Sequence, residues 1–210
     1  MICRLLPLVP AVLLWPTTLA AAIDPDALIA RLARPAPASI AFKEVRVSPL
    51  LREPLVVAGQ LEFSGPSSLD RHVREPYRED TSIRGESVRV EREGEQPRSF
   101  ALKRAPELRG LLTGFSALLS GDVPALKRSF DVQAQGSEES WTLLLVPLDT
   151  RARRRLQKIE ITGHDSTPRC FSLLNADGGA SVMILGDAAG EVARSDTLES
   201  LKELCQGRGA

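Results

Sequence analysis

The feature that most constrains the fold is a series of short segments in which apolar and charged residues alternate. In 87–92, for example, Val88 and Val90 alternate with charged neighbours, and in 39–47 Ile40, Phe42, Val45 and Val47 alternate roughly with Lys43, Glu44 and Arg46. A period of two is typical of a half-buried strand, and turn residues such as Gly85 and Gly94 separate neighbouring segments. Short strands at regular spacing indicate an antiparallel meander. The predicted strands are 39–47, 54–63, 69–74, 80–84, 87–92, 99–103, 130–134, 141–148, 156–163, 169–175 and 181–186.

Leucine-rich stretches with a different period interrupt or flank this run of strands. The longest places Leu and Phe at spacings of three and four between Leu108 and Leu119, which indicates an amphipathic helix. Pro106 suits its first turn, and Gly121 suits its end. The predicted helices are 25–32, 106–119, 123–129 and 196–205.

Together these elements predict an α+β fold in which short helices cover a curved antiparallel sheet. A sheet of about ten strands twists and curls, so its concave face has to be covered. Aromatic residues make up only 4% of the chain, so few large side chains can fill the space below the helices. We therefore expect an apolar cavity suited to an acyl chain, with plain core packing of the same leucines as the alternative. The residues predicted to line the cavity are Phe42, Val57, Leu61, Phe63, Leu111, Leu112, Phe115 and Leu118.

Residues 1–22 have the composition of a secretory signal peptide. One positive charge precedes an almost wholly apolar run over 5–15, and small residues follow over 17–22. The apolar run is shorter than the roughly 20 residues that a spanning helix needs. We expect cleavage near Ala21 and a single mature domain over 23–210 outside the cytoplasm, with an uncleaved anchor as the alternative.

Two cysteines, Cys170 and Cys205, follow the predicted signal peptide. An even number of cysteines in an oxidising compartment suggests a disulfide. In the chain-entropy model, closing a loop of about 35 residues would stabilise the fold by roughly 4 kcal/mol. The alternative is two separate buried thiols.

Charge and reactive residues argue against several functions. The chain has 27 basic and 27 acidic residues, so it lacks the basic excess of a nucleic-acid-binding protein. Neither His72 nor His164 has a metal-ligand spacing, and no nucleophile elbow occurs, so we expect no metal, no cofactor and no enzyme. A hydrolase that uses His164 or Ser166 is the distant alternative. The basic cluster over 151–155 is expected to be a solvated turn, or else a contact for anionic headgroups or an acidic partner.

A set of motifs, in this order along the chain, resembles the LolA-like outer-membrane lipoprotein carrier family and especially its LolA-related subgroup. In that subgroup, F-x-E-x-R with a Leu-Leu-x-x-Pro-Leu segment precedes G-x-L-x-[FY]. Their order, rather than any one motif, carries the resemblance. The matching segments are FKEVRVSPLLREPL at 42–55, GQLEF at 59–63, LLSGD at 118–122, WTLLLVP at 141–147 and IEITG at 159–163.

The resemblance implies an incomplete β-barrel whose apolar cavity is covered by helices. It also implies a periplasmic carrier that takes lipid-modified cargo from an inner-membrane donor complex to an outer-membrane acceptor, and we expect a monomer. Carriers of this family usually have Arg-Pro in the turn after G-x-L-x-x, where the Arg ties the helices to the barrel. This chain has Gly65-Pro66 there, so a free or esterified acyl or polyene lipid is as reasonable a cargo as a lipoprotein. The alternative function is a non-enzymatic module for envelope interaction or assembly without lipid cargo.

Overall fold

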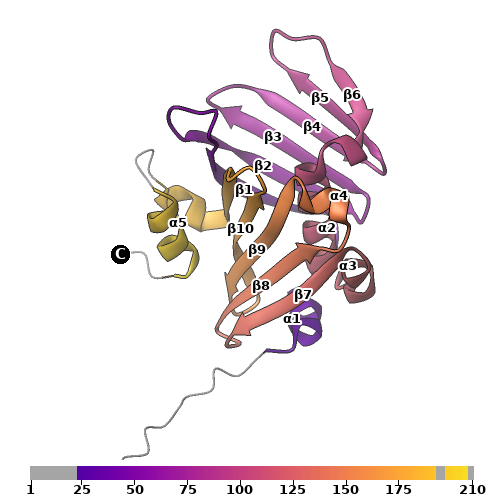
Figure 1. The fold of residues 1–210 in the computed structure, drawn as a ribbon, viewed down its shortest axis with the longest axis vertical. Coiled ribbons are helices and arrows are strands. Elements are labelled where there is room, and N and C mark those ends of the chain that lie inside the picture. The colour runs from indigo at the N-terminus through magenta and orange to yellow at the C-terminus, as the bar shows by residue number, and fades with distance from the viewer. Residues whose placement is uncertain (1–22, 193–196, 208–210) are drawn as a thin grey trace, which may run out of the picture.

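A curved antiparallel sheet organises the computed structural model, which describes residues 23–192 and 197–207 (Figure 1). Eleven strands pair in the order β6-β5-β4-β3-β2-β1-β11-β10-β9-β8-β7. Strands β6 and β7 are therefore free edges, and the sheet forms an incomplete barrel. The strands are β1 Ala38–Val47, β2 Leu55–Gly65, β3 Ser68–Glu75, β4 Glu79–Arg84, β5 Ser87–Arg92, β6 Arg98–Ala101, β7 Phe130–Gly136, β8 Ser140–Pro147, β9 Leu156–His164, β10 Thr167–Asn175 and β11 Ala180–Leu185.

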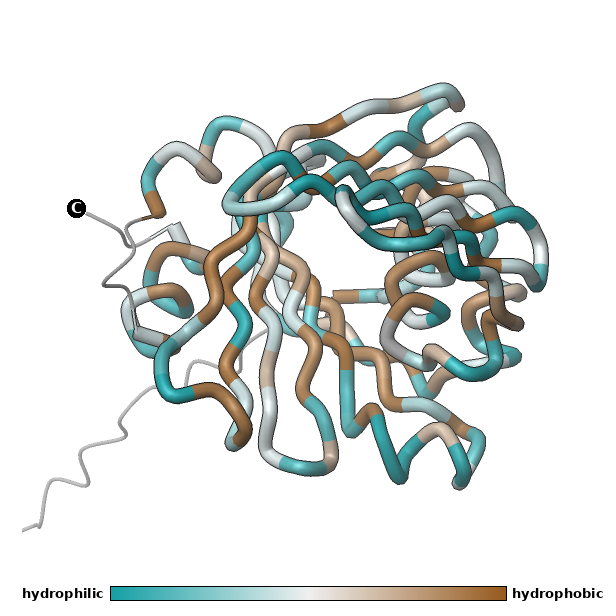
Figure 2. The backbone as a smooth tube through the Cα atoms, turned by 90° about the horizontal axis from the view of Figure 1, so that it is seen from above, coloured by the Kyte–Doolittle hydropathy of each residue, from teal (hydrophilic) through white to brown (hydrophobic). Residues whose placement is uncertain are grey.

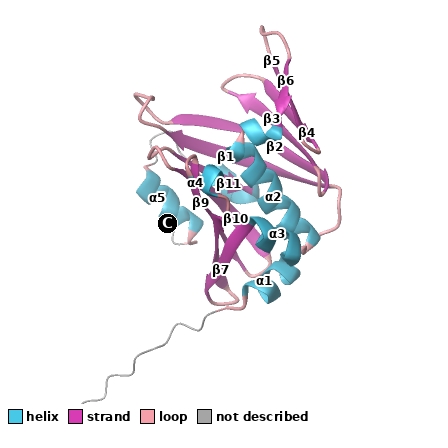
Figure 3. Ribbon diagram, turned by 45° about the vertical axis from the view of Figure 1, so that its right-hand side comes forward, coloured by secondary structure: helices cyan, strands magenta, loops and turns pink. Residues whose placement is uncertain are grey.

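The helical part of the chain connects the two free edges. The 3-10 helix η1 (Leu102–Arg104), α2 (Pro106–Ser120) and α3 (Val123–Ser129) follow β6 and lead directly into β7. They lie over the concave face of the sheet together with α1 (Pro25–Leu32) (Figure 3). The remaining helical elements are α4 Thr150–Arg153, η2 Gly186–Glu191 and α5 Leu198–Cys205.

Local sequence signals account for the helix ends. The Asp24 carboxylate caps α1 by accepting a hydrogen bond from the backbone N–H of Asp26, at 3.1 Å. Asp122 caps α3 in the same way, through the N–H of Ala125 at 2.9 Å. Helix α2 ends where Gly121 adopts a φ of 67°, a left-handed conformation that glycine reaches without steric cost.

The central strands β1, β10 and β11 are buried on both faces. On the concave face Phe42 belongs to the main core cluster below α2, whereas on the convex face Val45 belongs to a smaller cluster below η2 and α5. The predicted bridge between Cys170 and Cys205 is present, with Cα atoms 5.5 Å apart, and it ties α5 to β10. The sheet is thus enclosed between α2 on one side and the C-terminal segment on the other.

Every predicted strand and helix has a counterpart in the structure, but two details of the prediction are wrong. The charged segment 149–155 is exposed yet contains the short helix α4, because the Asp149 carboxylate caps the N–H of Arg151 at 3.0 Å. In β1, Glu44 does not alternate with Phe42. Both are buried, at 4% and 2% exposure, because residues two apart in a strand point to the same face.

The two halves of the sheet differ in polarity (Figure 2). Strands β8 to β11 are rich in Leu, Ile and Val, whereas β3 to β6 carry many charged residues. On β3 to β5 most of these charges are paired, and three exposed or half-exposed pairs illustrate this. The pairs are Arg74–Asp80 at 2.7 Å, Arg84–Asp70 at 2.6 Å and Arg89–Glu91 at 2.5 Å.

The predicted signal peptide lies outside the described residues. None of the helices within 23–192 or 197–207 has the length and apolar character needed to cross a bilayer.

Candidate functional site

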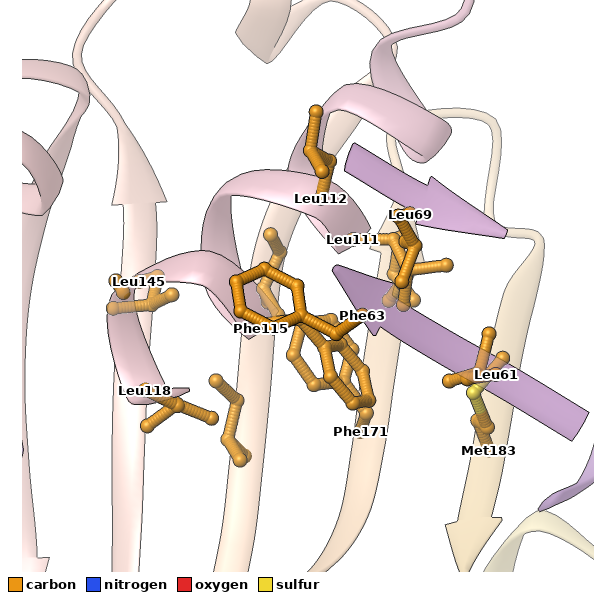
Figure 4. Packing of buried hydrophobic residues seen from close by; sticks show 14 of the residues in the cluster. Leu61, Phe63, Leu69, Leu111, Leu112, Phe115, Leu118, Leu145, Phe171 and Met183 are labelled. Atoms are coloured by element: carbon orange, nitrogen blue, oxygen red, sulfur yellow. The ribbon is translucent and has the colours of Figure 1, made fainter. Parts of the chain in front are cut away.

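Helix α2 packs directly against the concave face of the sheet (Figure 4). A Cβ atom on Gly114 would lie 2.5 Å from Cζ of Phe171, and one on Gly110 would lie 2.9 Å from Cδ1 of Ile159. The rings of Phe115 and Phe171 stack with their centroids 5.1 Å apart. Two glycines about one helical turn apart therefore allow the close approach of helix and strands.

All eight residues predicted to line a cavity belong to the core cluster beneath α2, with exposed fractions of 6% or less. Figure 4 shows that Leu111 and Phe115 of α2 point toward Phe63 of β2 and Phe171 of β10. These side chains pack against one another, so the described residues do not show the enclosed cavity predicted here. The eight residues are Phe42, Val57, Leu61, Phe63, Leu111, Leu112, Phe115 and Leu118.

A pocket of about 550 Å³, which we call the mouth pocket, opens beside this cluster at the start of α2. Its volume falls within the roughly 300–1,000 Å³ of small-molecule sites. Leu108 and Leu111 of α2 and Leu173 and Met183 of the sheet line its apolar side. Leu111 is thus the one predicted residue that reaches this pocket, while Leu112 lines a larger cleft on another side of α2. The charged wall of the mouth pocket is formed by Glu44, Arg46, Arg71 and Glu79.

That charged wall is a buried ion network. The Glu44 carboxylate accepts hydrogen bonds from Arg46 at 2.7 and 3.0 Å, and its Oε2 is 2.5 Å from Nη2 of Arg71. Arg71 also lies 3.6 Å from the Glu79 carboxylate, and its guanidinium is 5.0 Å from the centroid of the Phe42 ring. Glu44 and Arg71 are each 4% exposed, so neither charge has water to replace its partner.

The network keeps Glu44 ionised. Burial by itself would raise the pKa of Glu44, but attraction from Arg46 and Arg71, with hydrogen bonds from Arg46 and Ser181, lowers it from 4.5 to about 2. Burial likewise opposes the charge of Arg46, and the adjacent Glu44 carboxylate raises the pKa of Arg46 despite it. The charges of this wall are thus paired within the protein, and they face the apolar side of the mouth pocket.

A second contact joins α2 to the sheet at the β2–β3 turn. The Ser116 hydroxyl of α2 donates a hydrogen bond to the carbonyl oxygen of Pro66 at 2.8 Å. Gly65, which stands where the family resemblance places an arginine, has a φ of 146°. Residues with a side chain rarely adopt such a φ. In this chain, therefore, a serine rather than an arginine connects the helix to the turn.

The residues considered for catalysis are engaged elsewhere. Nδ1 of His164 is 3.0 Å from the carboxylate of its neighbour Asp165, while the Ser166 hydroxyl accepts a hydrogen bond from Arg34 at 3.0 Å. Across the described ranges, no hydrogen bond joins Ser166 to His164. Within 23–192 and 197–207, no three His, Cys, Asp or Glu side chains gather as a possible metal site.

Comparison with known proteins decides the family. A family model described as "Outer membrane lipoprotein carrier protein LolA-like" matches residues 17–209. The chain belongs to the LolA-like family. The match spans every described strand and helix, and it confirms the resemblance carried by the motifs of 42–63 and 118–163. No curated protein is similar enough to the LolA-like sequence to be matched.

Several solved structures are similar to this LolA-like chain at low identity. A LolA superfamily protein from Nitrosomonas europaea is 12% identical, with a TM-score of 0.44, over 79% of this chain and 92% of that chain. MucB, solved in complex with MucA(peri), is 14% identical, with a TM-score of 0.37, over 87% of this chain and 61% of its own. LprF from Mycobacterium bovis is 11% identical, with a TM-score of 0.33, over 81% and 93%. Because these scores are low, none of the three structures locates a functional residue in this chain.

The ion network is the part of the site that the sequence prediction missed. The signal was present in β1, where Glu44 and Arg46 lie in phase with Phe42. Their neighbour Val45 is apolar as well, so the strand has no face that is wholly polar. Charged residues in phase with an apolar residue, on a strand buried on both faces, indicate a buried pair.

Proposed function

We propose that this LolA-like protein is a non-enzymatic carrier that shields the acyl part of a lipoprotein or related lipid on its way to the outer membrane. The mouth pocket is the observation that carries the proposal. Its apolar side includes Leu111, Leu173 and Met183, which also belong to the core cluster below α2. An acyl chain that enters the pocket along this apolar side could extend between α2 and the sheet, and the cavity would exist in the loaded protein.

The packed helix sets how tightly cargo would be held. Burial of apolar surface contributes roughly 25 cal/mol per Å². The eight cavity residues, from Phe42 to Leu118, are already buried against one another when no lipid is bound. Bound lipid would therefore replace apolar contacts within the protein by apolar contacts with the lipid. The net binding free energy would be much smaller than the buried area of the lipid suggests. Such a carrier releases its cargo to any acceptor that binds it more tightly.

The proposal includes a location and partners. Residues 1–22 would direct export, and the mature domain over 23–210 would act in the periplasm as a monomer. A disulfide between Cys170 and Cys205 fits an oxidising compartment. An inner-membrane complex would load the cargo, and an outer-membrane acceptor would receive it.

The test is native mass spectrometry of protein purified from the periplasm of its own cell, followed by analysis of the released lipids. We expect lipid-bound mass in the wild-type protein. Ala180 lines the mouth pocket, so Ala180→Phe should obstruct it and lower the bound lipid by about fivefold. Ala41→Phe makes the same change at an exposed position of β1 and should leave the lipid content unchanged. A wild-type protein without lipid, or equal lipid in both variants, would contradict the proposal.

An envelope interaction module without cargo is the second candidate, and one observation favours it. At the tip of the loop between β1 and β2, Leu50 is 92% exposed and Leu51 is 42% exposed. Exposed apolar side chains at a loop tip are typical of contacts with another protein. If Leu50→Ser abolishes capture of an envelope protein and the wild-type protein holds no lipid, this second function is the correct one.

A further inference from the structure

A second hollow, of about 1170 Å³, lies along another side of α2 and is lined by a different set of its residues. Six basic side chains line it, and they come from η1, α2, α3, α4 and the segment that follows α4. The whole chain has equal numbers of basic and acidic residues, so the fold concentrates positive charge here. We call this hollow the basic cleft. Its basic residues are Lys103, Arg104, Arg109, Arg128, Arg151 and Arg155.

Most of these cations have no ionic partner. Arg109 is 3.5 Å from the Glu86 carboxylate, and the other five form no ion pair within the described part of the chain. The other two carboxylates that line the cleft have local roles, since Asp122 caps α3 at 2.9 Å and Asp149 caps α4 at 3.0 Å. The basic cleft therefore presents uncompensated positive charge.

We propose that the basic cleft binds an acidic segment of a partner protein. Cations that come from separate elements and surround one recess can contact carboxylates on several sides of an inserted chain. A volume of about 1170 Å³ exceeds the usual range of small-molecule sites and suits an extended segment. Exposed cations of this kind mainly accelerate association and select partners by charge. The proposal rests on charge and shape alone and does not depend on lipid cargo.

The shape of the cleft favours a protein segment over a membrane surface. Leu102, Leu126 and Leu156 form part of its floor, and each is only 2% exposed or less. None of these three leucines projects outward as insertion into a bilayer interface would need, and one exposed leucine beside the cleft, Leu148 at 46%, is a single side chain rather than an apolar face. A flat anionic surface would also contact the rim of the recess rather than its interior.

The experiment measures the anisotropy of a fluorescein-labelled peptide of about ten residues, with Asp and Gly in alternation, mixed with the purified protein. We expect binding at about 50 mM NaCl that weakens strongly at about 300 mM NaCl. The triple variant Arg104→Gln, Arg128→Gln, Arg151→Gln should lower the affinity by about tenfold. The matched control removes three exposed, unpaired cations elsewhere, through Arg52→Gln, Arg78→Gln and Lys202→Gln, and should change the affinity less than about twofold.

Zero-length carbodiimide coupling of the same peptide locates the contact. The cross-link should form at Lys103 in preference to the exposed Lys202. Circular dichroism melting of both triple variants confirms that they are folded. The proposal is overturned if both triple variants lose the same affinity, or if Lys202 couples as readily as Lys103. It is also overturned if vesicles of phosphatidylcholine and phosphatidylglycerol bind through these arginines while the peptide does not.

Discussion

The two hollows beside α2 contain the same kind of side chain in opposite circumstances. In the mouth pocket, Arg46 and Arg71 are bound to Glu44, and the pair Glu44–Arg71 is buried. In the basic cleft, Arg128 and Arg151 are exposed and have no carboxylate partner within the described ranges. A buried, paired arginine cannot be removed without leaving its partner's charge uncompensated in the folded chain, whereas an exposed, unpaired one is free to bind another molecule. The comparison therefore separates the residues that build the protein from those that we propose recognise a partner.

The largest expected effect comes from removing one half of the buried pair. Arg71→Met leaves the Glu44 charge without its buried partner and should lower the free energy of unfolding by about 3–5 kcal/mol. Arg128→Met in the basic cleft should change it by less than about 0.5 kcal/mol. Urea denaturation at neutral pH measures both values. Similar losses for the two variants would remove the distinction between the hollows.

The second test uses pH. The pKa of Glu44 is about 2 in the folded protein and 4.5 as its ordinary value, so its stabilisation is complete above pH 4.5 and is lost as the pH falls to about 2. The difference corresponds to about 3 kcal/mol at neutral pH. Glu44→Gln should flatten the dependence of the free energy of unfolding on pH in this window. Glu86→Gln, which changes a carboxylate of the basic cleft, should leave the slope of the wild-type protein intact.

A third test compares the two faces of α2. Gly114→Ala places a methyl group against the fully buried Phe171 ring and should cost about 2 kcal/mol, despite the better helix propensity of alanine. Thr113→Ala alters the neighbouring residue, which lines the basic cleft, and should change stability by less than about 0.5 kcal/mol. Thermal and urea unfolding of the two variants give the comparison. An unaffected Gly114→Ala protein would mean that the helix does not lie as close to β10 as described.

The smallest effect concerns the hydrogen bond between α2 and the β2–β3 turn. Ser116→Ala removes the donor to Pro66 and should cost about 1 kcal/mol. If α2 has to separate from the sheet for loading, the same change should speed uptake of a fluorescent fatty acid by about fivefold. Ser120→Ala is the control, because the Ser120 hydroxyl has only local bonds: it donates to the Ser116 carbonyl oxygen and accepts from the N–H of Asp122. Stopped-flow fluorescence should show no acceleration for Ser120→Ala. If both variants take up the fatty acid at the same rate, the contact between α2 and the turn does not limit loading.

Local pattern predicts the strands and helices because their boundaries are determined by neighbouring residues. The helix over 123–129 and the strand over 87–92 have the predicted limits, since Asp122 caps the first and glycine turns bound the second. The number of cysteines that follow residues 1–22 predicts the bridge between Cys170 and Cys205, and the helix over 106–119 is only one residue longer than predicted.

The charged parts of the candidate site were harder to predict, for two physical reasons. Strand β1 is covered on both faces, so alternation of apolar residues no longer shows which side chains point inward. Glu44 was therefore predicted on the face opposite to Phe42, although both lie on the same buried face. The basic cleft combines Arg104, Arg128 and Arg151, which are far apart in sequence and meet only when the sheet curls. The cluster over 151–155 was visible in the sequence, but its companions from η1 and α3 were not.

The route by which α2 is attached limits how it can move. Its chain comes from one unpaired border of the sheet and, through α3, returns to the other. A segment fastened at both ends cannot swing outward about a single hinge. To make room for a guest molecule, the whole β-surface would have to uncurl, so that loading changes the separation between Arg98–Ala101 and Phe130–Gly136. A pair of spin labels on Ser99 and Gln133, exposed residues of these borders that line neither hollow, would then report occupancy.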